Sequence, residues 1–326
     1  MTVPPVIRRW LGPICGGLLA AWYTHAYMNW NPQAIKDFDQ NWVAARALLT
    51  FQNPYALIGP GRLFPSAFPL AYPITTAVAV LPLGLLPLGV ARLVFAGISV
   101  TLLLWAVGPR GWRIVVPMLL SRPFMNALWN VQWSLLLTAA MARPDVLSWL
   151  APVKPSIGLG VLGACTTRRQ VATALAVGLL LLLVSLALRP TWVPEWIASV
   201  RQSPAFPPPM TRLGGPLLLL AGLRWRDPDA RMLLGLSIMP QTPGWYEALP
   251  LFLIPRTWVG SAVLMVGSHL AFQQGVPTWL APSWSVEERA IAVQLSLYLP
   301  ALVMVLSRGV EWPAWRRRLK SPPAAG

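Results

Sequence analysis

Residues 171–188 read VATALAVGLLLLLVSLAL, an apolar run relieved only by Thr173, Gly178 and Ser185. A helix of roughly 17 to 25 such residues crosses about 30 Å of hydrocarbon. Lipid offers no hydrogen-bond partner to backbone amide and carbonyl groups, so a crossing segment of this kind has to be helical. This stretch therefore predicts a membrane-spanning helix.

The composition extends this prediction to the whole chain. The 326 residues are 56% hydrophobic and only 11% charged, whereas a soluble domain has roughly 25% charged residues. So few charges cannot cover a water-exposed surface. We expect an all-α fold, a polytopic transmembrane helical bundle that forms a single integral membrane domain over residues 1–326.

Further apolar runs give the expected spans. They lie at about 11–28, 69–87, 90–107, 114–141, 171–188, 231–254, 257–273 and 289–307. A break is expected near Pro123 in the fourth run, and the run at 231–254 is interrupted. Shorter apolar pieces at 145–152, 157–165 and 214–223 predict half-helices or re-entrant segments, so the chain has roughly 8 to 11 membrane helices. Scattered arginines leave the crossings between 87 and 144 undecided.

The chain has a formal net charge of +16, and several of its basic residues sit in short clusters beside apolar runs. These clusters are Arg8 and Arg9, Arg168 and Arg169, and Arg316, Arg317, Arg318 and Lys320. Cytoplasmic loops have this pattern under the positive-inside rule, so we interpret the clusters as topology signals and not as a nucleic-acid surface. Residues 29–68 then form the first extracytoplasmic loop, and 308–326 form a cytoplasmic basic tail. The expected location is the inner (plasma) membrane, crossed several times.

Proline is abundant, at 35 residues, and several prolines lie inside or beside apolar runs. Proline removes a helical hydrogen bond and kinks or breaks the helix. Broken helices at membrane depth are tolerated where they are buried in protein or line a cavity. We therefore expect a cavity in the bundle, although membrane helices in general carry more proline than soluble ones.

The first outer loop holds two acidic candidates, Asp37 and Asp39. They precede the segment 41–51, in which Trp42, Ala45, Leu48 and Leu49 recur with a helical period, as in an amphipathic helix at a membrane interface. A carboxylate at the mouth of such a helix is placed to act on a substrate from the outer leaflet. An Asp that merely caps the helix is the alternative, and residue type alone leaves both open.

Several motifs of the chain resemble those of a known family. They are Asp37-Phe38, Ala44-Ala45-Arg46-Ala47-Leu48, Asn53-Pro54-Tyr55, Tyr72-Pro73, Val131-Gln132-Trp133-Ser134, Lys154-Pro155 and Tyr246-Glu247. In this order they resemble the membrane glycosyltransferases of family 87, in the C-type (GT-C) superfamily. The chain departs from the family pattern where Val131 replaces Gly, Ser134 replaces Asn, Ile74 replaces the second Pro of Tyr-Pro-Pro, and Glu247 replaces Asp.

The resemblance implies a membrane glycosyltransferase of GT-C type that moves a sugar, mannose above all, from a polyprenyl-phosphate donor to a lipid or glycan acceptor at the outer face. Asp37 would be the general base that takes the proton of the acceptor hydroxyl, with Asp39 as its local rival. Lys154 would stabilise the departing polyprenyl phosphate, although a lysine that only snorkels to an interface is the alternative.

The resemblance also implies further contacts. Gln132 joins Lys154 as a donor-phosphate residue. Substrate-binding residues would be Tyr55, Tyr72, Tyr246 and Glu247. A lipid-phosphate donor needs no metal, so we expect neither a metal nor another cofactor, and the expected partners are the donor, the acceptor and membrane lipids.

Two other functions stay open. A transporter or lipid flippase would use the broken helices and Lys154 to bind a substrate at the midplane, although the sequence shows no inverted repeat. A degenerate, non-catalytic member of the family would bind only lipid or a partner.

Overall fold

The computed structural model describes residues 5–31, 34–203, 206–240, 242, 246–272 and 285–308. The regular structure of these residues is all helical and includes no β-strand. Three helical segments, Leu88–Arg110, Arg168–Leu188 and Glu287–Leu306, are long and apolar enough to cross a membrane. They match the predicted runs at 90–107, 171–188 and 289–307.

The helical elements follow one another with few long connections. In chain order they are α1 (Pro5–Trp30), α2 (Asp37–Leu49), α3 (Pro54–Leu57), α4 (Ile74–Ala79), α5 (Leu81–Gly84), α6 (Leu88–Val107), η1 (Gly108–Arg110), α7 (Trp112–Leu119), α8 (Arg122–Trp129), α9 (Ser134–Ala142), α10 (Pro144–Leu147), η2 (Ser148–Val153), α11 (Pro155–Ala164), α12 (Arg168–Leu188), α13 (Trp192–Arg201), η3 (Pro209–Thr211), η4 (Gly215–Arg224), α14 (Pro228–Ile238), η5 (Tyr246–Leu253), α15 (Trp258–Phe272), α16 (Val286–Val293), the π-helical η6 (Gln294–Tyr298) and α17 (Leu299–Leu306).

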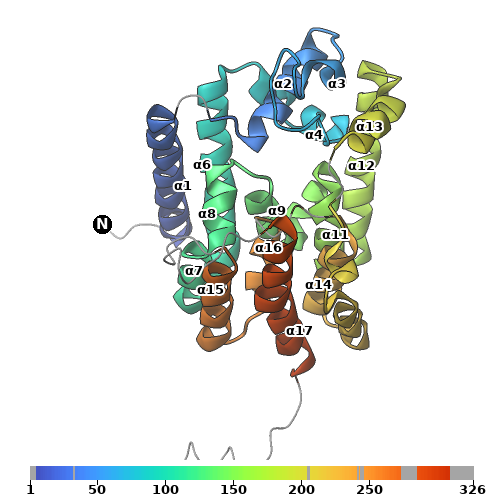
Figure 1. Ribbon diagram of the computed structural model, residues 1–326. Coiled ribbons are helices and arrows are strands. Elements are labelled where there is room, and N and C mark those ends of the chain that lie inside the picture. Colours follow the sequence, from blue (N-terminus) through green and yellow to red (C-terminus); the bar gives the residue numbers. More distant parts are fainter. Residues whose placement is uncertain are drawn as a thin grey trace, which may run out of the picture.

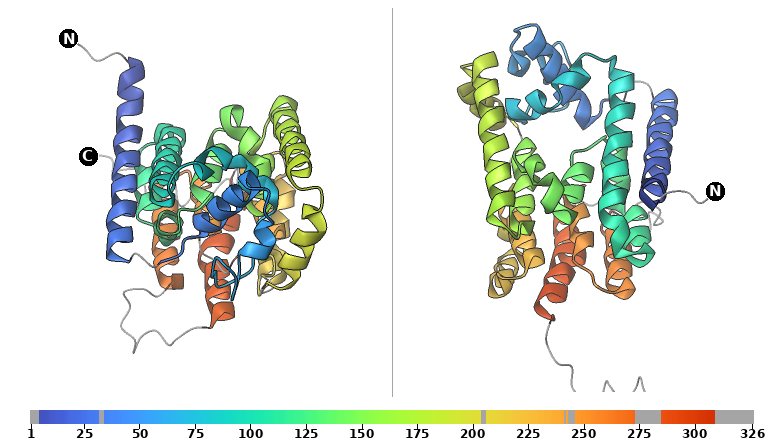
Figure 2. Two further views of the ribbon diagram at one scale, coloured as in Figure 1. Left: turned by 90° about the horizontal axis from the view of Figure 1, so that it is seen from above. Right: turned by 180° about the vertical axis from the view of Figure 1, so that it is seen from behind.

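The long helices flank a group of shorter ones. Figures 1 and 2 show α1 and α6 side by side on one flank and α12 on the opposite flank, with α9, α11, α16 and α17 between them. Helices α2, α3 and α4 form a layer across one end of the molecule (Figure 1). This layer, called the α2 layer below, covers the ends of the inner helices.

The close approach of α1 to α6 depends on small residues. A Cβ atom added to Gly17 would lie 1.9 Å from Oγ1 of Thr101 and 2.5 Å from the carbonyl oxygen of Gly97. Small residues of this kind let membrane helices pack with their backbones close together. The opposite face of α1 carries exposed Leu18, Leu19 and other large apolar side chains, as expected of a lipid-facing surface.

Prolines set many of the helix boundaries. Pro73 and Pro87 are the N-cap residues of α4 and α6, and Pro155 occupies the first turn of α11. The run at 69–87, predicted as one span, forms instead the short helices α4 and α5. The physical reason is its prolines, since Pro82 cannot continue the helix from α4.

The predicted interruptions of the other runs are confirmed. The run at 114–141 is divided into α7, α8 and α9, and α8 begins with Arg122 and Pro123. The run at 231–254 gives α14 and η5 with a separate connection between them. The short pieces at 145–152, 157–165 and 214–223 correspond to α10 with η2, to α11 and to η4.

The basic start of α12 and the α2 layer lie at opposite ends of the bundle. Figure 1 shows that α12, which begins with Arg168 and Arg169, starts at the end opposite the α2 layer, and that α17 ends there. The loop at 29–68, which contains α2 and α3, lies at the other end. The predicted tail at 308–326 lies outside the described residues except for Arg308.

Candidate functional site

Asp37 is the first residue of helix α2. Lys36 is the N-cap residue in an extended conformation, and its backbone N–H donates to Oδ2 of Asp39 at 2.6 Å. Phe38 is buried against Phe95, with ring centroids 4.6 Å apart. The capping role therefore belongs to Asp39, and the half-buried Asp37 carboxylate is left for other contacts.

Asp39 is bonded into the scaffold. Its Oδ1 accepts from Nε of Arg92 at 2.7 Å, and its Oδ2 accepts from Nη2 of the same side chain at 2.5 Å. Asp39 has no exposed surface, and Arg92 is 8% exposed. This two-point ion pair fastens α2 to α6 and occupies both carboxylate oxygens, so Asp39 holds the position of its neighbour Asp37.

Asp37 meets residues from two distant parts of the chain. Its Oδ2 accepts a hydrogen bond from Nε2 of Gln132, in the turn before α9, and one of 2.9 Å from the hydroxyl of Tyr246, at the start of η5. Gln132, which the resemblance implies as a donor-phosphate residue, and Tyr246, which it implies as a substrate-binding residue, thus both contact the predicted base.

Lys154 completes this group. It is the N-cap residue of α11 and is 6% exposed. Its Nζ lies 3.4 Å from Oε1 of Gln132 and 3.7 Å from Oε1 of Glu247. The ammonium also lies 5.3 Å from the ring centroid of Tyr72 and 4.8 Å from that of Tyr246, within the range of cation–π attraction.

We call these six residues the Asp37 cluster: Asp37, Tyr72, Gln132, Lys154, Tyr246 and Glu247. All six were predicted from the sequence, and they come from five separate segments of the chain. The cluster holds two carboxylates and one cation. A positive side chain beside paired carboxylates, in a largely buried setting, is typical of a functional site.

Glu247 is a buried member of the cluster that sequence reasoning assigned only to substrate contact. Its Oε2 accepts a 2.7 Å hydrogen bond from the hydroxyl of Thr242, and its Oε1 faces Lys154. Thr242 had no signal in the sequence, because a lone Thr between prolines is unremarkable. Its role follows only from the folded chain, which places its hydroxyl beside Glu247.

Gln132 is held by an unusual backbone. The preceding residue, Val131, has a φ of +53°, in the left-handed region that β-branched residues rarely adopt. Val131 is buried, and this is the position at which the resembling family carries Gly. Strained backbone of this kind tends to occur at functional sites, and here it directs Gln132 between Asp37 and Lys154.

Tyr55 is not a member of the Asp37 cluster, although it contacts the backbone of Tyr72. Its hydroxyl donates a 3.2 Å hydrogen bond to the carbonyl oxygen of Tyr72, and its backbone N–H is capped by the side chain of Asn53. The Asn-Pro-Tyr motif thus positions Tyr72. The structure gives Tyr55 a supporting contact where the resemblance implied a substrate contact.

The surroundings of Asp37 affect its ionisation. Burial raises the pKa of the Asp37 carboxyl above its ordinary value, while Lys154 and the hydrogen bonds from Tyr246 and Gln132 oppose this shift. At the N-cap of α2, burial and the positive charge of Arg92 lower the pKa of the Lys36 ammonium to about 8. A carboxylate with a raised pKa is a stronger base, which suits proton abstraction near neutral pH.

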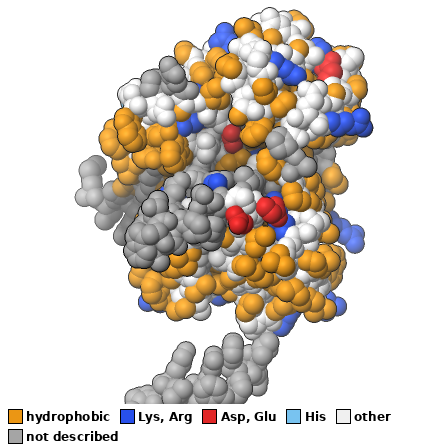
Figure 3. Space-filling view, viewed as in Figure 1, with side chains coloured by type: hydrophobic (Ala, Val, Ile, Leu, Met, Phe, Trp, Pro, Cys, Tyr) orange, Lys and Arg blue, Asp and Glu red, His pale blue; other side chains and the backbone are white. Residues whose placement is uncertain are grey.

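The space-filling view in Figure 3 shows a hollow between the α2 layer and α16, with acidic side chains within it and along its lower edge. Among the described residues, no group of three or more His, Cys, Asp or Glu side chains is arranged to hold a metal ion. The Asp37 cluster offers a carboxylate base, a neighbouring cation and aromatic rings.

None of the protein-family models, curated proteins or solved structures with which the chain was compared matches it.

Proposed function

We propose that this chain is a multi-pass GT-C-type glycosyltransferase of the inner membrane. It transfers a sugar, here proposed to be mannose, from a polyprenyl-phosphate donor to a lipid or glycan acceptor at the outer face. The observation that carries the proposal is the meeting of Asp37, Gln132, Tyr246 and Lys154 at the start of α2. These residues belong to four separate motifs of the resemblance, and a chance likeness gives no reason for them to converge.

The reaction needs one base. The acceptor oxygen attacks the anomeric carbon of the donor, the bond from that carbon to the phosphate oxygen breaks, and the bonding electrons leave with the polyprenyl phosphate. Asp37 takes the proton of the acceptor hydroxyl as the new glycosidic bond forms. Asp39 is less suited, because Arg92 and the Lys36 amide occupy both of its oxygens.

The leaving phosphate needs a positive partner. Lys154 has three N–H donors, and its contacts to Gln132 and Glu247 are long, at 3.4 and 3.7 Å. Such weak contacts are readily exchanged for a shorter, charge-assisted bond to a phosphate oxygen. Lys154 would then stabilise negative charge as it develops on the leaving group.

The arrangement of the helices supports a membrane setting. Three helical segments are long and apolar enough to cross a bilayer. The Asp37 cluster lies toward the α2 layer, and the basic start of α12 lies at the opposite end (Figure 1). This polarity suits a site at the outer face with basic loops in the cytoplasm.

The proposal is tested by product analysis in proteoliposomes that contain the purified chain, labelled polyprenyl-phosphate mannose and bacterial membrane acceptors. We expect a glycosidically linked product that accumulates with the protein and is absent from protein-free liposomes. Movement of the label across the bilayer without a new glycosidic bond would identify a transporter instead. Binding of the donor with neither product nor movement would identify a non-catalytic relative.

A further inference from the structure

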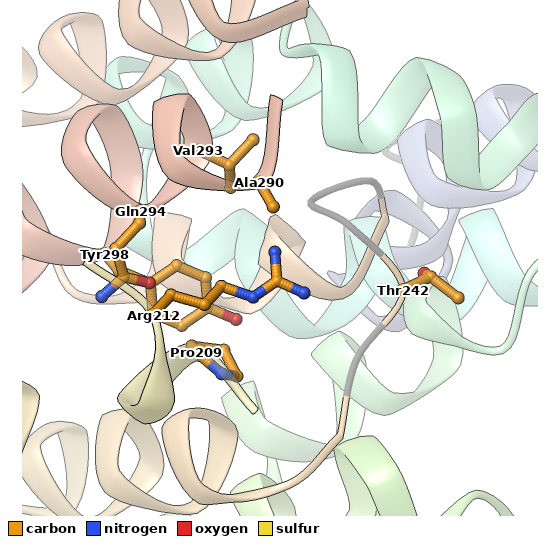
Figure 4. A pocket seen from close by; sticks show the side chains of 7 residues that line it. All are labelled: Pro209, Arg212, Thr242, Ala290, Val293, Gln294 and Tyr298. Carbon is orange, nitrogen blue, oxygen red and sulfur yellow. The ribbon is translucent and has the colours of Figure 1, made fainter. Parts of the chain in front are cut away.

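A pocket lined in part by Thr242, which contacts Glu247 of the Asp37 cluster, is not used by the proposed reaction. Its lining residues are Pro209, Arg212, Thr242, Ala290, Val293, Gln294 and Tyr298. Figure 4 shows the Arg212 side chain reaching across the pocket from the side of Gln294 and Tyr298 toward the side of Thr242. We call it the Arg212 pocket. The pocket is small: the centre of a water molecule can move within about 10 Å³ of it.

Arg212 is a buried cation that forms no salt bridge with a described carboxylate. It is 9% exposed, and within the described part of the chain no carboxylate oxygen lies within 4.0 Å of its guanidinium. Its Nη2 donates to the carbonyl oxygen of Pro207 at 3.2 Å, but its buried Nε has no acceptor among the described residues. An unpaired buried charge is strongly destabilising.

Gln294 adds a second unused donor. The side chain is 1% exposed, and its buried Nε2 has no acceptor in the residues that the structure describes. Gln294 is the first residue of η6, a π-helical turn inside the α16–α17 helix. Single π-turns of this kind are frequent at functional sites. Two buried donors from separate segments therefore face one pocket, and neither has an acceptor among the described residues.

The missing acceptor is best supplied by an anion. A guanidinium binds phosphate oxygens with good geometry and is less strongly hydrated than an ammonium. We propose that the Arg212 pocket binds a phosphate group, either on a lipid or as the free anion. This inference rests on the two unused donors and does not depend on sugar transfer.

The pocket is linked to the Asp37 cluster through one residue. Thr242 lines the pocket, and its hydroxyl donates to Glu247, which pairs with Lys154. A phosphate held by Arg212 would therefore share a pocket with Thr242, which contacts Lys154 indirectly through Glu247.

The test is thermal unfolding of the purified chain in a neutral detergent at constant ionic strength. The ligands are inorganic phosphate, dioctanoyl phosphatidic acid and dioctanoylglycerol, which has the same chains without the phosphate. We expect the unfolding midpoint to rise with a phosphate-bearing ligand and not with dioctanoylglycerol. A rise with phosphatidic acid alone identifies a lipid headgroup as the ligand, and a rise with inorganic phosphate as well shows that the free anion suffices.

Two variants assign the effect to the pocket. Arg212→Gln should weaken phosphate binding at least about tenfold, the effect of losing one charge-assisted hydrogen bond, and Gln294→Met should weaken it to a smaller extent. Arg201→Gln, which changes an exposed arginine at the end of α13, should bind phosphate as the unchanged chain does. Without ligand, Arg212→Gln should unfold at a higher temperature, because it removes an unpaired buried charge.

The proposal is overturned if no phosphate-bearing ligand raises the midpoint, or if Arg212→Gln and Gln294→Met both bind phosphate like the unchanged chain. A lower midpoint of ligand-free Arg212→Gln would also contradict it. None of these measurements requires transfer activity, so failure of this site and failure of the proposed function are distinguishable.

Discussion

The hydroxyl of Tyr246 donates a 2.9 Å hydrogen bond to Oδ2 of Asp37, although the two residues are 209 positions apart in the sequence. Gln132 donates to the same oxygen from the turn before α9. The first turn of α2 is thereby tied to two segments of the inner bundle. The candidate base is held by contacts that form only when the whole chain has folded.

Tyr246→Phe tests the effect of this hydrogen bond on the base. The bond lowers the pKa of Asp37, so its loss raises that pKa further and leaves less ionised carboxylate in acid solution. We expect transfer to fall about tenfold at the acid end of the pH profile and to recover as the pH rises. The measurement is transfer rate against pH, with Tyr23→Phe, an exposed residue of α1, as the control. An equal loss at every pH would contradict this role.

Asp37→Asn should stabilise the chain at neutral pH. Burial raises the pKa of the folded carboxyl above its ordinary value of 3.8. The protonated form thus favours folding at low pH, and that contribution is lost as the pH rises through the folded pKa. Asn resembles the protonated form at every pH. Thermal unfolding in detergent should show a higher midpoint for Asp37→Asn near pH 8 and a shrinking difference toward pH 4, and a lower midpoint at both pH values would contradict the assignment.

Asp39→Asn should have the opposite effect on stability. It removes the negative partner of Arg92, which is 8% exposed, and breaking a buried pair in this way costs about 3–5 kcal/mol. Asp145→Asn is the matched control, because it breaks the exposed Arg143–Asp145 pair, which is worth about 1 kcal/mol or less. Chemical unfolding measures both, and similar losses in the two variants would show that the Asp39 pair does not fasten α2.

Val131 allows a test of backbone strain beside Gln132. Both Val131→Gly and Val131→Ala remove buried methyl groups, but only Ala keeps a Cβ atom at a φ of +53°. We expect the Gly variant to be more stable than the Ala variant by about 1 kcal/mol. At a position with ordinary backbone angles the order would be reversed, so a more stable Ala variant would exclude strain here.

The apolar runs at 90–107, 171–188 and 289–307 predicted their helices well, because length and hydropathy alone decide whether a segment can cross a bilayer. The same two criteria, length and hydropathy, gave a wrong prediction for the run at 69–87. Its hydropathy suggested a span, but Pro73, Pro82 and Pro87 divide it into short helices.

The members of the Asp37 cluster were predicted through the resemblance, and their distances were not. Periodicity placed Asp37 near the start of a helix, but it could not decide between a base and a cap. The structure assigns the capping contact to Asp39, through the bond from the Lys36 amide and the pairing of Asp39 with Arg92. The unused donors of Arg212 and Gln294 were missed, because only the folded chain shows which polar atoms lack a partner.

The central claim is that Asp37 is the base of sugar transfer, and the most direct test is the single-turnover rate in proteoliposomes with polyprenyl-phosphate mannose. Asp37→Asn should lower this rate by at least about 10²-fold, as expected for loss of a general base, while the protein stays folded and Asp145→Asn keeps full activity. A folded Asp37→Asn protein that transfers sugar as fast as the unchanged chain would contradict the claim.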